Sequence, residues 1–371
     1  MQTMHPTLLI GPADWDAAAM PRQEFKERIA ALWDVCEPDV ARVIVFGSAR
    51  HHAELAWFTH FTPKLEPGLA LIERCGAVRL FVGGGVNMLD AARPLTWVDE
   101  LLPLYRAPKA IAESMRESRD AGRLAMIGGD AMPFDFRREI AAALGQVASQ
   151  IAIDITPRLA PLMGRKSARE LAAIRQSCVT LDGAIAALGT AWRDGAAVTT
   201  AILDAEGAAN RAGAQDVRTL FSLDGGRTLV PFTGLDARRI DPLQVHVAVR
   251  QRGYWAEGFA MFSTSPSTAQ RCAAAALQRA VAAARPGLPR RAMAELLTPP
   301  QRAHPVVART PVATPGLGFE DAGFGRDGAE ALESNCVYSL RLGILDGLEG
   351  AIVSAMVALT GDGAEVLWVQ P

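Results

Sequence analysis

The stretch that decides the fold is Gly253-Tyr254-Trp255-Ala256-Glu257-Gly258-Phe259-Ala260-Met261-Phe262. Its aromatic and apolar residues are typical of a β-strand. Side chains alternate between the two faces of a strand, so Glu257 lies on one face between Trp255 and Phe259. A carboxylate among aromatic rings needs a partner, because a buried charge without one is costly. We therefore expect Glu257 to be paired with a polar or charged group.

A second strand is predicted directly before this one, over Gln244–Arg250. Alternation places three valines on one face and the polar residues Gln244, His246 and Arg250 on the other. From the pattern alone, His246 belongs to a half-buried strand whose polar face is solvated or satisfied by its neighbours.

The first part of the chain alternates strand and helix signals, which is typical of an α/β domain. The expected strands are 42–47, 78–82 and 124–127, and the expected helices are 23–33 and 136–147. The stretch Asp154–Arg165 carries two prolines and a glycine, so we interpret it as a linker.

A long helix is predicted after the linker. Ser167 and Glu170 have the spacing of a capping box, and apolar residues follow at steps of three and four. Further helices are expected over 198–212 and from Ser265-Pro266 to Pro286-Gly287, with strands over 337–342 and 353–359. Together they predict an α+β second domain.

Composition limits the function classes. A chain of 371 residues suggests two domains. The net charge of -2 argues against nucleic acid or an anionic membrane as a partner. Five scattered cysteines without C-x-x-C spacing indicate a reducing compartment. We see no signal peptide, and no apolar segment reaches the length of about 20 residues that a membrane span needs. We expect a cytoplasmic protein.

Several segments together resemble the creatinase / aminopeptidase P / prolidase superfamily. They are the Gly253–Phe262 stretch, Arg165–Arg175, Arg285-Pro286-Gly287, 357–367 and Leu55–Thr59. The resemblance implies a creatinase-type α/β N-terminal domain over 1–156 and an α+β pita-bread C-terminal domain, creatinase-like, over 157–371. It also implies a homodimer, because two-domain members usually pair.

Active metallopeptidases of this superfamily hold two metal ions with two Asp, one His and two Glu. Carried over by position, these ligands fall on His246, Glu257, Val312, Arg341 and Ser354, with Glu320 taken as the end of the motif around Val312. A cation among the ligands repels a divalent metal ion. The resemblance therefore implies a member that lacks the metal ligands, and we expect neither a metal nor another cofactor.

The resemblance also brings His246, Glu257 and Arg341 into one cleft. His246 is then a candidate general base, Glu257 its orienting carboxylate or a cation anchor, and Arg341 an anion contact. A buried Glu257–Arg341 pair that replaces the metal is the structural alternative.

Further candidate substrate-binding residues are Arg250, Tyr254, Trp255 and Glu320, whereas His304, which precedes Pro305, is expected to be exposed. Two functions follow from different classes. The first is a metal-independent, creatinase-like hydrolase or lyase that acts on a C–N bond of a small polar substrate. The second is a non-catalytic pseudo-peptidase of the Xaa-Pro aminopeptidase type that binds a small molecule or a protein partner.

Overall fold

The structure is a computed structural model that describes residues 14–117, 122–145, 151–231, 237–298, 302–304, 307, 311–318, 331–361 and 363–370. The chain divides into two compact units, Met1–Met163 and Gly164–Pro371. The sequence placed the boundary seven residues earlier, at 156/157. The predicted linker over 154–165 is wrong, because Thr156–Gly164 forms helix α6, in which Pro161 lies inside the helix.

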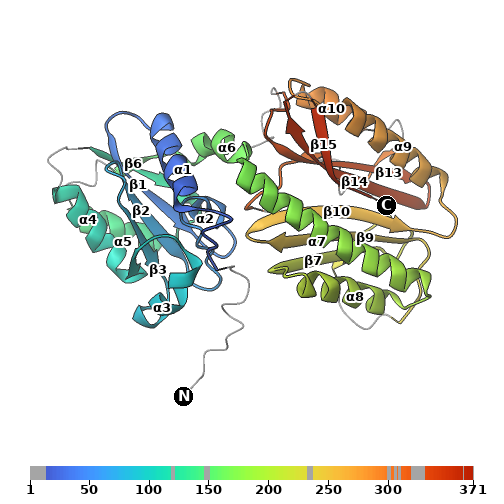
Figure 1. Cartoon of the computed structure of the whole chain (residues 1–371), viewed down its shortest axis with the longest axis horizontal. Coiled ribbons are helices and arrows are strands. Elements are labelled where there is room, and N and C mark those ends of the chain that lie inside the picture. Colours follow the sequence, from blue (N-terminus) through green and yellow to red (C-terminus); the bar gives the residue numbers. More distant parts are fainter. Residues whose placement is uncertain are drawn as a thin grey trace, which may run out of the picture. The chain divides into compact units, whose positions relative to one another are not determined.

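The first unit is an α/β unit (Figure 1). Its strands are β1 (Val40–Gly47), β2 (Gly68–Glu73), β3 (Val78–Val82), β4 (Glu100–Pro103), β5 (Arg123–Ile127) and β6 (Ile151–Asp154). Its other α-helices are α1 (Arg22–Val35), α2 (Ala53–Thr59), α3 (Leu89–Ala92), α4 (Ala107–Glu117) and α5 (Phe134–Leu144). Three of these strands and two of these helices match the segments predicted from the sequence.

The described strands of this unit form one mixed sheet in the order β4-β3-β2-β1-β5-β6, in which β2 is antiparallel to β1 and β3. Alternation along β1 directs Ile44 and Phe46 to one face, where they join Ile111 of α4 and Ile140 of α5 in a hydrophobic core. Helices α1 and α2 lie on the other face (Figure 1). The sheet is therefore covered on both sides.

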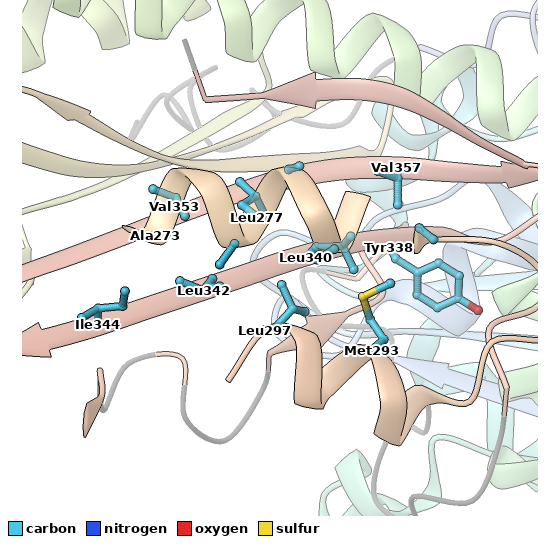
Figure 2. Packing of buried hydrophobic residues seen from close by; sticks show 14 of the residues in the cluster. Ala273, Leu277, Met293, Leu297, Tyr338, Leu340, Leu342, Ile344, Val353 and Val357 are labelled. Carbon is cyan, nitrogen blue, oxygen red and sulfur yellow. The ribbon is translucent and has the colours of Figure 1, made fainter. Parts of the chain in front are cut away.

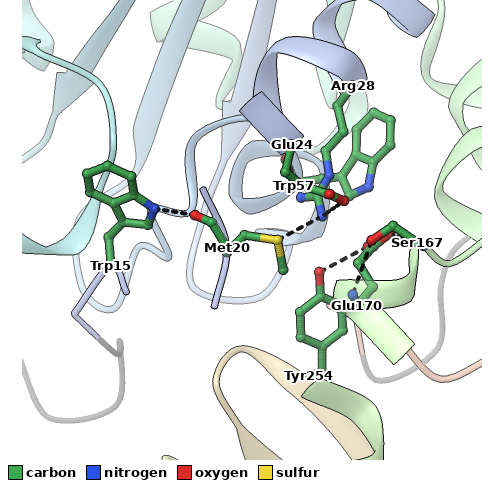
Figure 3. Close-up of polar contacts among 8 residues, drawn as sticks. All are labelled: Trp15, Met20, Glu24, Arg28, Trp57, Ser167, Glu170 and Tyr254. Carbon is green, nitrogen blue, oxygen red and sulfur yellow. Dashed lines mark hydrogen bonds and ion pairs between the residues drawn. The ribbon is translucent and has the colours of Figure 1, made fainter. Parts of the chain in front are cut away.

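A buried arginine of helix α1 links this helix to α2 (Figure 3). The guanidinium of Arg28 donates to the backbone carbonyl of Trp57 at 2.8 Å and pairs with Glu24 at 3.2 Å. It also lies 5.4 Å from the Trp57 ring centroid, a cation–π distance. A carbonyl, a carboxylate and an aromatic ring thus compensate one buried charge.

The second unit is α+β. Its helices are α7 (Ala168–Arg193), α8 (Val198–Arg211), α9 (Thr268–Ala283) and α10 (Arg290–Leu296). Its strands are β7 (Asp216–Phe221), β8 (Val230–Pro231), β9 (Leu243–Gln251), β10 (Tyr254–Phe262), β11 (Arg302–Ala303), β12 (Val312–Ala313), β13 (Val337–Asp346), β14 (Glu349–Thr360) and β15 (Gly363–Val369). The predicted second-domain strands and helices are all present, with shifted ends. Helix α9 begins after Ser267, not at Ser265-Pro266.

The described strands of the second unit form two sheets. One has the order β10-β9-β7-β8, and the other has the order β11-β13-β14-β15 with β12 also paired to β13. Helix α7 packs on β9 and β10, and α9 packs on β13 and β14. Figure 2 shows the second of these cores, where Leu277 of α9 meets Leu340, Leu342 and Val353 of the sheet. The two sheets meet where β10 contacts β14.

The predicted capping box at the start of α7 is confirmed (Figure 3). The Ser167 side chain accepts from the backbone N–H of Glu170, and the Glu170 carboxylate accepts from the backbone N–H of Ser167 at 3.0 Å. The same carboxylate accepts from the Tyr254 hydroxyl at 2.9 Å. Glu170 therefore links the first turn of α7 to the first residue of β10.

Helix α7 has the length and composition of a membrane span, contrary to the expectation from the sequence. Half of an apolar 18-residue window of α7 is buried inside the unit. The helix packs there on β9, β10 and α8. This arrangement is that of a core helix in a two-layer unit.

Gly258 is required by close packing in the middle of β10. A Cβ atom at this position would lie 2.9 Å from Cζ2 of the buried Trp368 ring and nearer still to two other ring atoms. Gly258→Ala should therefore lower the free energy of unfolding by about 1–3 kcal/mol. Chemical denaturation followed by tryptophan fluorescence measures the change.

Gly183→Ala is the matched control, because Gly183 lies in α7 and a Cβ atom added there would meet no neighbouring side chain within 4 Å in the described part of the chain. Alanine is the better helix former, so this variant should be more stable by about 0.5–1 kcal/mol. A Gly258→Ala protein as stable as the parent would contradict the packing of Trp368 on β10.

Candidate functional site

Three charged or titratable side chains of the second unit meet at one point. His246 lies on β9, Glu257 on β10 and Arg341 on β13. His246 Nε2 is 3.0 Å from Glu257 Oε2, and Arg341 Nε donates to Glu257 Oε1 at 2.7 Å. A second guanidinium nitrogen of Arg341 also contacts Oε1. We call these residues the ionic triad, and the predicted Glu257–Arg341 pair is confirmed.

The carboxylate is the centre of the ionic triad. Burial by itself would raise the pKa of Glu257, but the charge of Arg341 and the hydrogen bond from His246 outweigh it and lower that pKa from 4.5 to about 2. Glu257 is therefore ionised at neutral pH.

The ionic triad is buried. Glu257 is 1% exposed, whereas His246 and Arg341 are each 6% exposed. The ring of His246 also packs against that of Phe259, with centroids 4.4 Å apart and the ring planes tilted by 33°. The three polar groups thus converge on one another, and what little surface remains belongs to the imidazole and the guanidinium.

Strand β10 is held in place by side chains of β14, which the sequence did not predict. Strand β10 is the last strand of its sheet in the described part of the chain, so the backbone N–H groups on its outer edge need other acceptors. The N–H of Phe259 donates to Ser354 Oγ at 2.8 Å, and the N–H of Glu257 donates to Met356 Sδ at 3.3 Å. Because Ser354 lies opposite Arg341 in the β13–β14 ladder, it connects the strands that carry the ionic triad.

The predicted substrate-binding residues of β9 and β10, which are Arg250, Tyr254 and Trp255, are all buried. Tyr254 is engaged by Glu170, so its hydroxyl belongs to the helix contact described above. Arg250 lies opposite Trp255, with its guanidinium carbon 5.6 Å from the ring centroid, and burial lowers its pKa. Their binding roles stay predictions, and Glu320 lies outside the described residues.

The expectation that His304 is exposed is wrong. Its ring is fully buried, and Nε2 lies 3.0 Å from the Gly226 carbonyl oxygen. Burial lowers the pKa of His304. The histidine fits against β13 because Gly343 has no side chain there: a Cβ atom would lie 2.6 Å from the His304 Cβ. His304 is thus a buried packing residue.

The positions that the resemblance assigned to metal ligands do not fit a pair of metal ions. Val312 is apolar and pairs with Leu340, and the hydroxyl of Ser354 accepts from the backbone of β10. Arg341 places a positive charge on the carboxylate of Glu257. No group of three or more His, Cys, Asp or Glu that could hold a metal ion occurs among the residues that the structure describes.

Comparison with known proteins gives a likeness in structure alone. No protein-family profile and no curated protein matches the chain. The X-Pro aminopeptidase from Thermotoga maritima matches with a TM-score of 0.70 and 15% identity, covering 93% of this chain and 98% of that one.

Two further solved structures match over similar lengths. The prolidase from Pyrococcus horikoshii has a TM-score of 0.71 and 14% identity, with 94% of this chain and 99% of that chain covered. Aminopeptidase P from Escherichia coli, in a structure with the inhibitor Pro-Leu, has a TM-score of 0.73 and 17% identity. The match covers 96% of this chain and 95% of that chain. The chain therefore has the two-domain, creatinase-like pita-bread fold, as the sequence predicted.

The burial of the ionic triad predicts its effect on stability. Glu257→Gln or Arg341→Met leaves its former partner as an uncompensated buried charge, which should lower the free energy of unfolding by about 3–5 kcal/mol. Chemical denaturation of each single variant measures this.

Arg175 and Glu365 supply the matched control, because this bidentate pair is 44% and 38% exposed. Glu365→Gln should lower the free energy of unfolding by about 1 kcal/mol or less. If the triad variants unfold like the Glu365 variant, the triad contributes no more than a surface pair.

The depressed pKa of Glu257 also predicts a pH dependence. A carboxyl whose pKa is lower in the folded state stabilises the fold above its unfolded pKa and loses that contribution as pH falls through its folded pKa. The difference in free energy of unfolding between the parent and Glu257→Gln should therefore be constant above about pH 5. It should shrink as the pH falls from 4.5 towards about 2. A difference that stays unchanged between about pH 5 and about pH 2.5 would contradict this assignment.

Proposed function

We propose that this chain is a metal-independent hydrolase that acts on a C–N bond of a small polar substrate. The observation that carries the proposal is the ionic triad, in which the buried carboxylate of Glu257 contacts both the imidazole of His246 and the guanidinium of Arg341. The names of the structural neighbours, X-Pro aminopeptidase and prolidase, support the bond class, because both denote enzymes that act on peptide C–N bonds.

His246 is the general base in this proposal. An ionised carboxylate only accepts hydrogen bonds, so the proton on the imidazole lies on Nε2, which faces Glu257. Nδ1 then carries the lone pair and takes a proton from water as the water oxygen attacks the substrate carbon. The same proton passes to the leaving nitrogen when the C–N bond breaks.

Arg341 is the electrostatic contact in this proposal. Its guanidinium neutralises Glu257, and in this proposal it also stabilises the negative charge that develops on the substrate oxygen or nitrogen. Glu257 orients both groups and does not itself take up a proton, since its pKa is about 2. These roles need no divalent metal ion, and none of their steps passes through one.

The burial of the triad favours a second function of a different class. His246 and Arg341 both contact Glu257, and the side chains of the three residues are only 8%, 7% and 2% exposed, respectively. A triad that only holds strands together suits a non-catalytic protein that binds a small molecule or a protein partner. We propose this pseudo-peptidase function as the alternative, and a cytoplasmic homodimer as the setting for either.

Hydrolysis by the chelator-treated protein tests the proposal. A panel of short peptides, simple amides, ureido compounds and guanidino compounds is incubated with it, and the release of amine or ammonia is measured. We expect turnover that a chelator does not change and that His246→Gln lowers by about a hundredfold or more. Exposed His51 is the control: His51→Gln should retain the parent rate.

No turnover on the panel, together with a ligand whose binding raises the melting temperature, would favour the binding function. Turnover that the His246→Gln variant retains would refute the role of His246.

The charge of Arg341 at a ligand position predicts the metal content. After dialysis against manganese, cobalt or zinc and removal of free metal, elemental analysis should find well under one ion per chain, and Xaa-Pro dipeptides should not be cleaved. One or two tightly bound ions per chain would contradict the proposed metal independence.

A further inference from the structure

An open hollow of about 420 Å³ lies on the second unit. Three segments line it: Arg165 at the start of the unit, the turn Pro286-Gly287 after α9, and residues 332–335 before β13. A hydrogen bond of 2.8 Å from the N–H of Gly287 to the carbonyl of Leu332 joins two of these segments. The volume falls within the range of about 300–1,000 Å³ that is typical of small-molecule sites.

The hollow is separate from the ionic triad. The backbone N–H of Asn335, in its lining, donates to the carbonyl of Leu359 at 2.6 Å. Leu359 lies five residues along β14 from Ser354, which is opposite Arg341 of the triad. Because a strand advances about 3.3 Å per residue, the hollow begins about 16 Å along β14 from the triad. A small molecule in the hollow therefore does not contact the triad.

One ion pair in the lining has unused hydrogen-bonding groups. Arg165 Nε donates to Glu333 Oε2 at 3.0 Å, and the two side chains are 67% and 29% exposed. Within the described part of the chain, this is the only hydrogen bond of either charged group. The Nη groups of Arg165 and the second oxygen of Glu333 are therefore available side by side, one as donors and the other as an acceptor.

We propose that this hollow binds a free α-amino acid with an aliphatic side chain. The carboxylate of the ligand accepts from the Nη groups of Arg165, and its ammonium group donates to Oε1 of Glu333. The contact between Arg165 and Glu333 remains, so the four charges alternate in sign. Leu332 and Pro286 give the lining an apolar part, which suits the aliphatic side chain.

The alternating charges favour a ligand that carries both signs. A simple carboxylate bound to Arg165 would lie beside the carboxylate of Glu333, and a simple amine bound to Glu333 would lie beside the guanidinium. Only a zwitterion has an attractive partner for each of its groups. The inference goes beyond the proposed function, because it concerns a second site with its own ligand.

Binding of three matched probes to the full chain tests the inference. L-Leucine carries both charges, N-acetyl-L-leucine carries only the carboxylate, and L-leucinamide carries only the ammonium group. Calorimetry should show that L-leucine binds more tightly than either of the others, by about tenfold or more. Arg165→Gln and Glu333→Gln should each remove that preference.

Glu365→Gln is the matched control, because it alters another exposed pair whose groups already satisfy each other. Arg175 holds both oxygens of Glu365, through Nε at 2.8 Å and Nη2 at 2.6 Å. A second control, His246→Gln, alters the ionic triad. Both control variants should bind L-leucine as the parent does.

The inference is overturned if the parent shows no preference for L-leucine, or if Arg165→Gln and Glu333→Gln keep it. Binding that is lost in His246→Gln and kept in Arg165→Gln would place the ligand at the triad, which also overturns the inference. The two proposals fail separately, since calorimetry does not depend on turnover. Binding of L-leucine that requires Arg165, in a protein without hydrolase activity, supports the inference and refutes the proposed function.

Discussion

The carboxylate of Glu257 is shared between a guanidinium and an imidazole in a place that water hardly reaches. Its two oxygens contact Arg341 and His246, and only 1% of the residue is exposed. A lone carboxylate in such a place would take up a proton or destabilise the fold. Because Arg341 supplies the compensating charge from the protein itself, the two sheets of the second unit can close around an ionised group.

The surrounding packing serves this contact. Ser354 and Met356 accept from the backbone N–H groups of Phe259 and Glu257, which fixes β10 beside β14. Gly258 lets the Trp368 ring lie directly on β10. The ionic triad therefore depends on neighbours that carry no charge, and it has the character of a fixed arrangement rather than of loosely held surface ions.

Much of the fold could be predicted from local signals. The Ser167–Glu170 capping box and the strands β9 and β10 depend on neighbouring residues, and the structure confirms them. The half-buried character predicted for β9 is wrong, because all nine of its residues are buried. Other features depend on contacts between residues far apart in the sequence. His304 is buried because Gly343 makes room for it and the Gly226 carbonyl accepts from it, and Arg165 pairs with Glu333. No spacing in the sequence predicts either contact.

The central claim is that Arg341 compensates Glu257 as a buried pair, and a double-mutant cycle tests it most directly. The free energies of unfolding of the parent, Glu257→Gln, Arg341→Met and the double variant give the coupling energy between the two side chains. The account predicts a coupling energy of about 2–3 kcal/mol. The double variant should therefore lose less free energy of unfolding than the two single variants lose together. Losses that add to within about 0.5 kcal/mol would show that the pair is not coupled and would contradict the account.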